Sequence, residues 1–147
     1  LHLMGEMGWS PKRIETMLYR ESGLLGVSGF EADSRELMDS PRVEAAEAID
    51  LFCLRIVGEV ARLAASIGGI DALVFTAGIG EHAPAVRAGV ADRLAFMGVK
   101  MDHARNALRG DGAWCLSAKD SKVKIFVIPT DEEFMIASDV ERIVNGK

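Results

Sequence analysis

One stretch of this sequence joins a buried-type strand, two closely spaced glycines and a helix start. Residues 71–82 read Asp-Ala-Leu-Val-Phe-Thr-Ala-Gly-Ile-Gly-Glu-His. The apolar run from Leu73 to Phe75 predicts a strand over residues 71–76, in a central position covered on both faces. Gly78 and Gly80 then predict a tight turn before a helix, where free N–H groups suit a phosphate or the polar parts of a nucleotide. Alternatively, the turn needs glycine only for its backbone angles.

The same segment fits a second nucleotide-binding pattern. Gly78-Ile-Gly-Glu-His-Ala83 matches the Gly-x-Gly-x-x-Ala fingerprint of dinucleotide-binding domains, and Asp102 stands about 20 residues further on, where a ribose-binding acid is expected. That fingerprint normally opens a parallel βαβ domain. Here a long predicted helix precedes the strand, and little β/α alternation follows it. Dinucleotide binding is therefore the lesser alternative.

Size and charge limit the classes of protein that fit the chain. Its 147 residues fall within the range of one domain and are enough to bury a core. The formal net charge of -5 argues against nucleic acid or an anionic membrane as the main partner, since both require a basic surface. No apolar run in the sequence reaches the roughly 18 residues of a membrane span. We expect a single cytoplasmic domain over residues 1–147.

Two serine-proline pairs predict helix starts in the first half of the chain. Ser10 before Pro11 predicts a helix over residues 11–19. Residues 21–29 are rich in glycine and predict a buried loop or a short 3₁₀ turn. Ser40 before Pro41 predicts a helix of about 27 residues that ends near Gly68. Its apolar positions cover so much of the circumference that we expect burial on more than one side, in part on a sheet and in part against another subunit or the N-terminal half.

The second half of the chain predicts further strands and a capped helix. Residues 99–101 and 123–128 are strand candidates, and Pro84 suits the first turn of a helix. Thr130-Asp-Glu-Glu133 fits a capping box, in which Thr130 and Glu133 exchange side-chain to backbone hydrogen bonds. One α/β domain accounts for all of these elements.

Four motifs in one order resemble the C-terminal half of the acetate kinase family, over essentially the whole chain. They are Glu21-Ser-Gly-Leu-Leu-Gly-Val-Ser-Gly29, Asp33-Ser-Arg35, Phe75-Thr-Ala-Gly-Ile-Gly-Glu81 with Val86-Arg87, and Ile128-Pro-Thr-Asp-Glu-Glu133. The resemblance implies the fold of the C-terminal domain of the actin, Hsp70 and sugar-kinase (ribonuclease H-like) superfamily, with a mixed sheet flanked by helices. It also implies Mg²⁺-dependent, reversible transfer of a phosphoryl group from ATP to acetate, giving acetyl phosphate and ADP.

The resemblance also implies what this chain does not supply. In the family an N-terminal half provides the first phosphate loop, the acetate pocket and the groups around the transferring phosphoryl, so we assign no catalytic residue here and expect the chain alone to be inactive. The family dimerises through its C-terminal half, which predicts a homodimer. Acetate, propionate and butyrate are not distinguished. The alternative from another class is a non-catalytic dimerisation or interaction module with the kinase fold.

Two segments are the nucleotide-binding candidates that the resemblance implies, on the adenosine side of ATP or ADP. The planar guanidinium of Arg35 suits stacking on a base, with a surface ion pair as the alternative. His82 stands where the family usually has asparagine, which puts nucleotide affinity and base preference in question, and its alternative role is an exposed helix N-cap. The candidate residues are Asp33, Ser34, Arg35, Gly78, Ile79, Gly80, Glu81 and His82.

Glu132 is the metal candidate, since the glutamate linked to Mg²⁺ in the family aligns with it. Mg²⁺ binds through one or two carboxylates together with substrate phosphates and waters. Capping accounts for Glu133, which leaves Glu132 available. In the alternative interpretation Glu132 is a solvated carboxylate favoured by the helix dipole, and Asp131 competes with it for the metal role.

Overall fold

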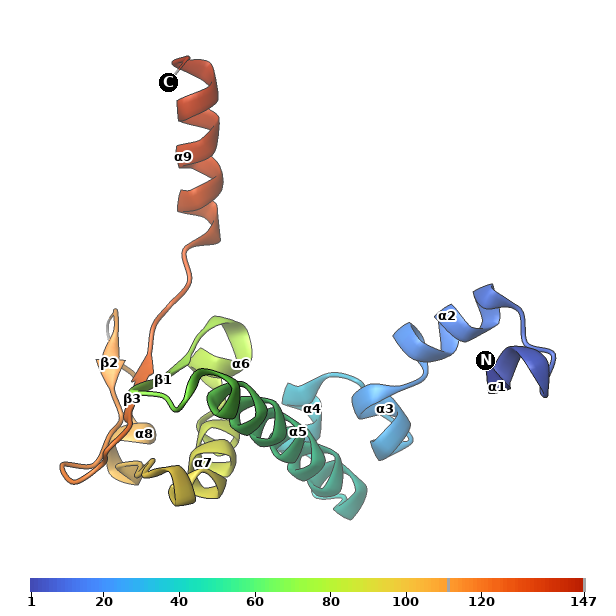
Figure 1. The fold of residues 1–147 in the computed structure, drawn as a ribbon, viewed down its shortest axis with the longest axis horizontal. Coiled ribbons are helices and arrows are strands. Elements are labelled where there is room, and N and C mark those ends of the chain that lie inside the picture. Colours follow the sequence, from blue (N-terminus) through green and yellow to red (C-terminus); the bar gives the residue numbers. More distant parts are fainter. Residues whose placement is uncertain (111, 147) are drawn as a thin grey trace. The chain divides into compact units, whose positions relative to one another are not determined.

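The structure is a computed structural model that describes residues 1–110 and 112–146. By their contacts these residues form two compact units, the first over Leu1–Arg62 and the second from Leu63 onward. The expectation of one domain over residues 1–147 stays a prediction. The elements, drawn in Figure 1, are α1 (His2–Gly5), α2 (Pro11–Arg20), α3 (Gly23–Ser28), α4 (Ser34–Asp39), α5 (Val43–Ile67), β1 (Ala72–Phe75), α6 (Ala77–His82), α7 (Pro84–Arg93), η1 (Ala95–Met97), α8 (His103–Asn106), β2 (Trp114–Cys115), β3 (Lys124–Val127) and α9 (Glu132–Val144).

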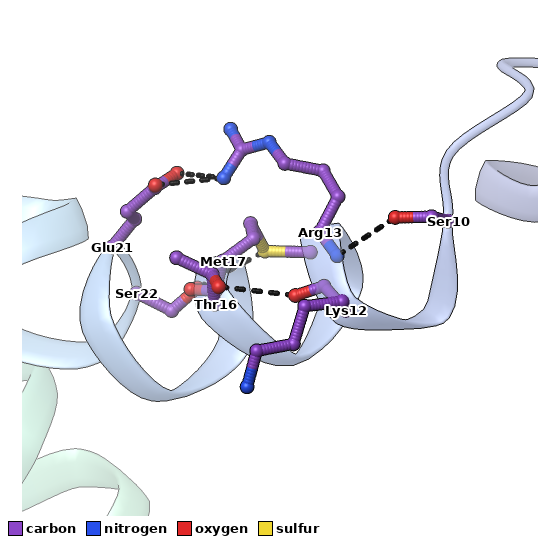
Figure 2. Close-up of polar contacts among 7 residues, drawn as sticks. All are labelled: Ser10, Lys12, Arg13, Thr16, Met17, Glu21 and Ser22. Atoms are coloured by element: carbon purple, nitrogen blue, oxygen red, sulfur yellow. Dashed lines mark hydrogen bonds and ion pairs between the residues drawn. The ribbon is translucent and has the colours of Figure 1, made fainter.

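Helix α2 forms where the Ser10-Pro11 pair predicts it. The Ser10 Oγ accepts a hydrogen bond from the Arg13 backbone N–H at 3.2 Å, and Pro11 occupies the first turn, which lacks intrahelical acceptors for its N–H groups. Glu21 and Ser22 follow the end of the helix and bond back to it. The Arg13 guanidinium donates to both carboxylate oxygens of Glu21 at 2.6 and 2.7 Å, and the Ser22 Oγ donates to the Met17 carbonyl at 2.8 Å (Figure 2). These contacts set the turn that leads into α3.

Residues 21–29 differ from the expected buried loop or 3₁₀ turn. They contain α3, an α-helix whose only buried residue is Ser28. Gly23 and Gly26 cost the helix some stability but do not end it, because glycine is permissive rather than prohibitive in a helix. The helix ends at Gly29, which takes a left-handed conformation with φ of 75°. The buried cluster of the first unit joins α4 to α5 through Leu37, Ala45 and Ala48.

Helix α5 runs over 25 residues and begins two residues after Pro41. Some of its apolar side chains are buried, while several large apolar side chains along its length stay exposed. The buried set is Ala45, Ala48, Cys53, Val57 and Ala64, and the exposed set includes Leu51, Leu54, Leu63 and Ile67. Within the described residues, this helix therefore carries more apolar surface than its own units cover.

The sheet of the second unit is small and mixed, as predicted, with strand order β1-β3-β2. Strand β3 pairs in parallel with β1 and antiparallel with β2, so it lies between them (Figure 1). The central position expected for β1 is wrong, since β1 lies at an edge and Val74 is 47% exposed. Four apolar residues fit an edge strand with one covered face as well as a central strand. Residues 99–101 form only isolated bridges, through Val99 to Val123 and Met101 to Ser117.

Helix α7 begins at Pro84 as predicted and contributes much of the core of the second unit. Pro84 occupies its first turn, and Val86, Val90 and Ala91 are buried along it. The other fully buried apolar side chains of this unit include Leu94, Val99, Leu116, Ile125 and Val127.

None of the helices in the described part of the chain combines the length and apolar content of a membrane span.

Candidate functional site

The glycine segment lies within a short helix and not in a turn. Helix α6 begins directly after β1, and Gly78 and Gly80 are both helical residues of it. The residue with a left-handed backbone is Ala77, whose φ is 57°. The expectation that the glycines serve the backbone angles of a tight turn is therefore wrong. Alanine at 77 tolerates this conformation only with strain, which is uncommon outside turns and functional segments.

The two glycines meet different surroundings. A Cβ built on Gly80 would approach the carbonyl carbon of Phe75 to 3.0 Å, so this glycine lets α6 fold back closely on the end of β1. A Cβ on Gly78 would have nothing within 4 Å. Gly80 is thus explained by packing. At Gly78 the protein itself leaves room for another molecule to approach the backbone, and the half-buried Ile79 lies between the two glycines.

His82 stands at the end of α6, so its alternative role as an exposed helix N-cap is wrong. The N-cap of α7 is Ala83, whose backbone N–H closes α6 by donating to the Ile79 carbonyl at 3.0 Å. The His82 side chain is exposed. Beside it is a hollow of about 340 Å³ whose lining includes Glu81, His82 and Arg109, and this volume falls within the roughly 300–1,000 Å³ of ligand pockets.

An arginine that belongs to one of the family motifs, but that was not predicted as a site residue, contacts the glycine segment. Arg87 on α7 is 1% exposed. Its Nη1 donates to the backbone carbonyls of Gly80 and Glu81 at 2.9 Å, and its Nε donates to the Asn106 Oδ1 at 2.7 Å. The sequence did carry a signal, since Arg87 stands at helical spacing with the apolar Ala91 and Leu94, on a face that should be buried.

Two hydrogen bonds join the glycine segment to the connection between β3 and α9. The Thr76 Oγ donates to the Ile128 carbonyl at 2.8 Å, and the Glu81 carboxylate accepts from the Thr130 backbone N–H at 3.1 Å. Both connections leave the carboxyl ends of β1 and β3. Because these strands are parallel, their carboxyl ends lie together at one end of the sheet, which we call the carboxyl edge of the sheet. In open α/β sheets this edge is the usual place of a ligand. The structure thus brings residues 78–82 together with the segment that carries Glu132.

The predicted capping box on α9 is wrong by one residue. The N-cap is Asp131, whose carboxylate accepts from the Phe134 backbone N–H at 2.9 Å. A short carboxylate at position 131 reaches the N–H three residues on, and the Thr130 N–H that Glu133 was expected to bind is instead bonded to Glu81. Capping accounts for Asp131, and it no longer accounts for Glu133.

Glu132 fits the chemistry of a Mg²⁺ ligand that works with a bound nucleotide. It is exposed in the first turn of α9, and among residues 1–110 and 112–146 its carboxylate has no hydrogen-bond or ion-pair partner. No group of three or more acidic, histidine or cysteine side chains gathers in this described part to hold a metal by itself. Mg²⁺ does not require one, since a single carboxylate with phosphate oxygens and waters completes its octahedron.

Asp33, Ser34 and Arg35 belong to the first unit and form a preorganised corner at the start of α4. Asp33 is the N-cap and accepts from the Arg35 backbone N–H at 2.8 Å. Its carboxylate also binds the Arg35 side chain in a two-point ion pair, at 3.1 Å to Nε and 2.7 Å to Nη2. These hydrogen bonds to Arg35 lower the pKa of Asp33 to about 2. Ser34 is buried, whereas the Arg35 side chain is 82% exposed.

The ion pair of Arg35 combines the two roles considered for it. The surface contact with Asp33 is present, and it holds the guanidinium plane in one orientation with its faces in solvent. Such a plane can receive the face of a nucleobase without first being ordered. The geometry is thus compatible with stacking.

Comparisons with known proteins match this chain over almost its whole length. The sequence model of the acetokinase family matches residues 1–138. An acetate kinase of Rhodopseudomonas palustris (strain TIE-1) is 51% identical over 146 residues, which are 99% of this chain and 36% of that protein. The crystal structure of Porphyromonas gingivalis acetate kinase superposes with a TM-score of 0.85 at 39% identity, covering 97% of this chain and 36% of that one. A propionate kinase from Francisella tularensis gives a TM-score of 0.80 at 37% identity, over 92% and 35% of the two chains. The chain therefore spans about a third of the length of the relatives it matches.

Proposed function

The chain belongs to the acetokinase family, and we propose that it is the C-terminal, nucleotide-binding part of an ATP-dependent acetate kinase of the actin, Hsp70 and sugar-kinase superfamily. The complete enzyme would transfer a phosphoryl group reversibly between ATP and acetate, giving acetyl phosphate and ADP. The observation that carries this proposal is the joined edge of the sheet, where the Glu81 carboxylate holds the Thr130 N–H. That bond connects the glycine segment to the helix that presents Glu132.

Each candidate segment, whether in the first unit or at this edge of the sheet in the second, has a role in binding that its chemistry suits. We assign residues 78–82 to the adenosine side of the nucleotide, where the open approach at Gly78 lets a ligand reach the backbone. The Arg35 guanidinium would stack on the base, and Glu132 would hold Mg²⁺. Mg²⁺, when bound, neutralises charge on the phosphate oxygens of the transition state. The chain alone is expected to bind nucleotide weakly and to turn over no substrate.

The acyl substrate is assigned only by class. Both an acetate kinase and a propionate kinase are among the similar structures, so a short carboxylate is the proposed acceptor. We also propose a cytoplasmic homodimer, in keeping with the exposed apolar side chains of α5, such as Leu51 and Leu54.

A non-catalytic interaction module is the second candidate, and one observation favours it. Helix α9 buries none of its residues, and its apolar side chains Phe134, Ile136 and Ile143 are each more than 60% exposed. A surface of this kind often marks a protein interface. The coding sequence upstream of Leu1 separates the candidates, because an in-frame phosphate loop with acyl-pocket residues would support the kinase.

The dinucleotide alternative loses the residue on which it depended. Asp102 is the N-cap of α8, where its carboxylate accepts from the Arg105 N–H at 3.1 Å and pairs with the Arg105 guanidinium at 3.4 Å. A helix cap accounts for this acid without a ribose. We expect ADP with Mg²⁺, but not NAD, to raise the melting temperature of the chain.

Calorimetry of nucleotide binding tests the proposed function directly. Mg²⁺-ADP is expected to bind weakly, and Arg35→Ala is expected to weaken it further because the stacking plane is lost. Arg13→Ala is the matched control, since Arg13 is also an ion-paired arginine of the first unit and we assign it no ligand. Tight binding that Arg35→Ala leaves unchanged, or a preference for NAD, would contradict the assignment.

A further inference from the structure

Arg87 is a buried cation whose partners are all neutral. Its guanidinium donates four hydrogen bonds. One goes to the Asn106 side-chain oxygen, and three go to the backbone carbonyls of Gly80, Glu81 and Asn106, the last from Nη2 at 2.9 Å. No carboxylate pairs with it among the residues that the structure describes. Burial lowers its pKa from the usual value. A charge kept in the core at this cost needs a reason beyond filling space.

The position of its acceptors supplies that reason. The carbonyls of Gly80 and Glu81 belong to the last turn of α6, where backbone carbonyls lack donors within the helix. The residue four places after Gly80 is Pro84, which has no N–H to offer. The Arg87 guanidinium therefore takes the place of the absent backbone donor. It also places a positive charge at the negative end of the helix dipole, which holds a helix of only six residues in register.

Asn106 is fitted to hold the guanidinium in this orientation. It is 4% exposed, and its Nδ2 donates to the Pro84 carbonyl at 2.8 Å while its Oδ1 accepts from Arg87. A side chain at this place must therefore donate on one side and accept on the other, which an amide does and a carboxylate does not. Asn106 thus connects α8 to the start of α7 and holds the Arg87 guanidinium in one orientation.

The network ends at the candidate site. Arg87 holds the Glu81 backbone carbonyl, while the Glu81 carboxylate accepts from the Thr130 N–H. A shift of Glu81 would move the connection that leads to Glu132 as well as the glycine segment itself. The same guanidinium thus bears on the glycine segment and on the β3–α9 connection, which are the two candidate parts of the nucleotide site in the second unit.

We propose that Arg87, oriented by Asn106, is a positioning residue that sets the backbone of residues 78–82 and, through Glu81, the β3–α9 connection for a nucleotide. This inference rests on the proposed function, because it takes the nucleoside diphosphate with Mg²⁺ as the ligand. A side chain that supports the core alone would affect folding, whereas a positioning residue also changes the affinity of molecules that are folded.

The test compares Mg²⁺-ADP affinity with stability in four variants. Arg87→Lys keeps the charge but loses the fork, and Asn106→Ala keeps Arg87 but loses its orienting amide. Val90→Ala is the destabilised control, since Val90 is fully buried on the same helix and bonds to no part of the segment, while Arg105→Lys is the exposed arginine control. Affinity is measured at a temperature where circular dichroism shows each variant to be folded.

The expected result is a selective loss of affinity. Losing hydrogen bonds to a charged group should weaken Mg²⁺-ADP binding about tenfold or more in Arg87→Lys and by a smaller factor in Asn106→Ala. Val90→Ala should lower the melting temperature and leave the dissociation constant of the folded chain unchanged, as should Arg105→Lys. Unchanged affinity in folded Arg87→Lys, or an equal loss in Val90→Ala, would overturn the inference.

Amide hydrogen exchange decides the positioning role even without nucleotide. The Ala83 and Thr130 N–H groups report on the segment, because they bond to the Ile79 carbonyl and the Glu81 carboxylate, and the Leu116 N–H, bonded to the Ile125 carbonyl, reports on the sheet. Arg87→Lys or Asn106→Ala should speed the first two relative to the third. Uniform change in all three would overturn the inference. Absence of binding by the unaltered chain would instead count against the proposed function, while the exchange rates still decide the role of Arg87.

Discussion

Asp33 shows how one exposed carboxylate can organise a candidate ligand group. It caps α4 through the Arg35 backbone N–H and holds the Arg35 guanidinium at two points. The hydrogen bond from the Arg35 side chain is the largest cause of the lowered pKa, followed by the bond from its backbone. The charged form of Asp33 is thus favoured by the same contacts that orient the proposed stacking plane.

The titration of Asp33 is the first prediction. Its carboxyl should titrate at about 2 in the folded chain, below the roughly 3.9 of an unfolded aspartate. A lowered pKa stabilises the fold above the unfolded value, so this contribution should be complete above about pH 4 and disappear as the pH falls to about 2. Arg35→Ala should raise the midpoint toward the unfolded value, measured by carbon-detected NMR. A midpoint that the substitution leaves in place would show that Arg35 does not cause the shift.

The two glycines of α6 give the second prediction, because their surroundings differ. Gly80→Ala should lower the melting temperature, since its Cβ would press against the Phe75 backbone at 3.0 Å. Gly78→Ala meets nothing and replaces a helical glycine, so stability should stay level or rise by about 0.5–1 kcal/mol. If a nucleotide approaches Gly78 closely, the same substitution should weaken Mg²⁺-ADP binding. Calorimetry beside thermal melting measures both quantities. Full affinity in Gly78→Ala would remove Gly78 from the site.

At the scale of elements, local chemistry was more predictable than tertiary position. Ser10-Pro11 and Pro84 mark real helix starts, because caps and proline geometry depend only on neighbouring residues. The edge position of β1 was not predictable. An apolar run indicates that the faces of a strand are covered, but it does not indicate whether the strand pairs on one side or on both. The Glu133 half of the predicted capping box was lost to a side chain 49 residues away, since Glu81 binds the Thr130 N–H.

The candidate site followed the same division. Residues 78–82 and Glu132 were predicted from local motifs and resemblance, and they stay predictions as site residues, although the Glu81 carboxylate does bond to the Thr130 N–H two residues before Glu132. Arg87 was quoted within a motif, but its network with Asn106 was not predicted because the two residues are 19 positions apart. An arginine within an apolar helical pattern is the signal that a sequence can give, but its partners depend on how α6, α7 and α8 pack.

The third prediction separates three neighbouring acids at the start of α9. Asp131→Ala should cost the helix about 1 kcal/mol, because the cap is lost, and backbone chemical shifts over residues 132–144 should show reduced helicity. Glu132→Ala should leave helicity nearly unchanged but weaken the Mg²⁺ dependence of ADP binding. Glu133→Ala is the matched control, since it removes the same charge from the same turn. Equal effects of the Glu132 and Glu133 substitutions on Mg²⁺ dependence would refute the metal assignment.

For the whole molecule, the main question is what covers its apolar surface. The chain spans about a third of the length of its relatives, and apolar side chains stay exposed on both α5 and α9. In the first unit, Leu51 and Leu54 stand beside an open hollow that Ala46, Glu47 and Asp50 also line. A second copy of the chain could cover this patch, because a two-fold axis places the same surface of two copies face to face.

The last prediction is that the chain forms a symmetric homodimer through this α5 patch. A permanent interface should bury about 2,000 Å² or more in total, and Leu51 and Leu54 would lie within it. The double substitution Leu51→Glu and Leu54→Glu should therefore give a folded monomer, because like charges would face each other across the axis. Ile143→Glu on α9 is the control, since it removes an apolar side chain that is even more exposed, at 75% against 40% for Leu51 and 51% for Leu54, from another surface and should leave the dimer intact. Light scattering over a dilution series gives the mass of each species. Two results would contradict this prediction: a mass that keeps growing as concentration rises, or a dimer that Ile143→Glu breaks and the α5 substitutions do not. Either result would show that association is not driven by a two-fold interface on α5.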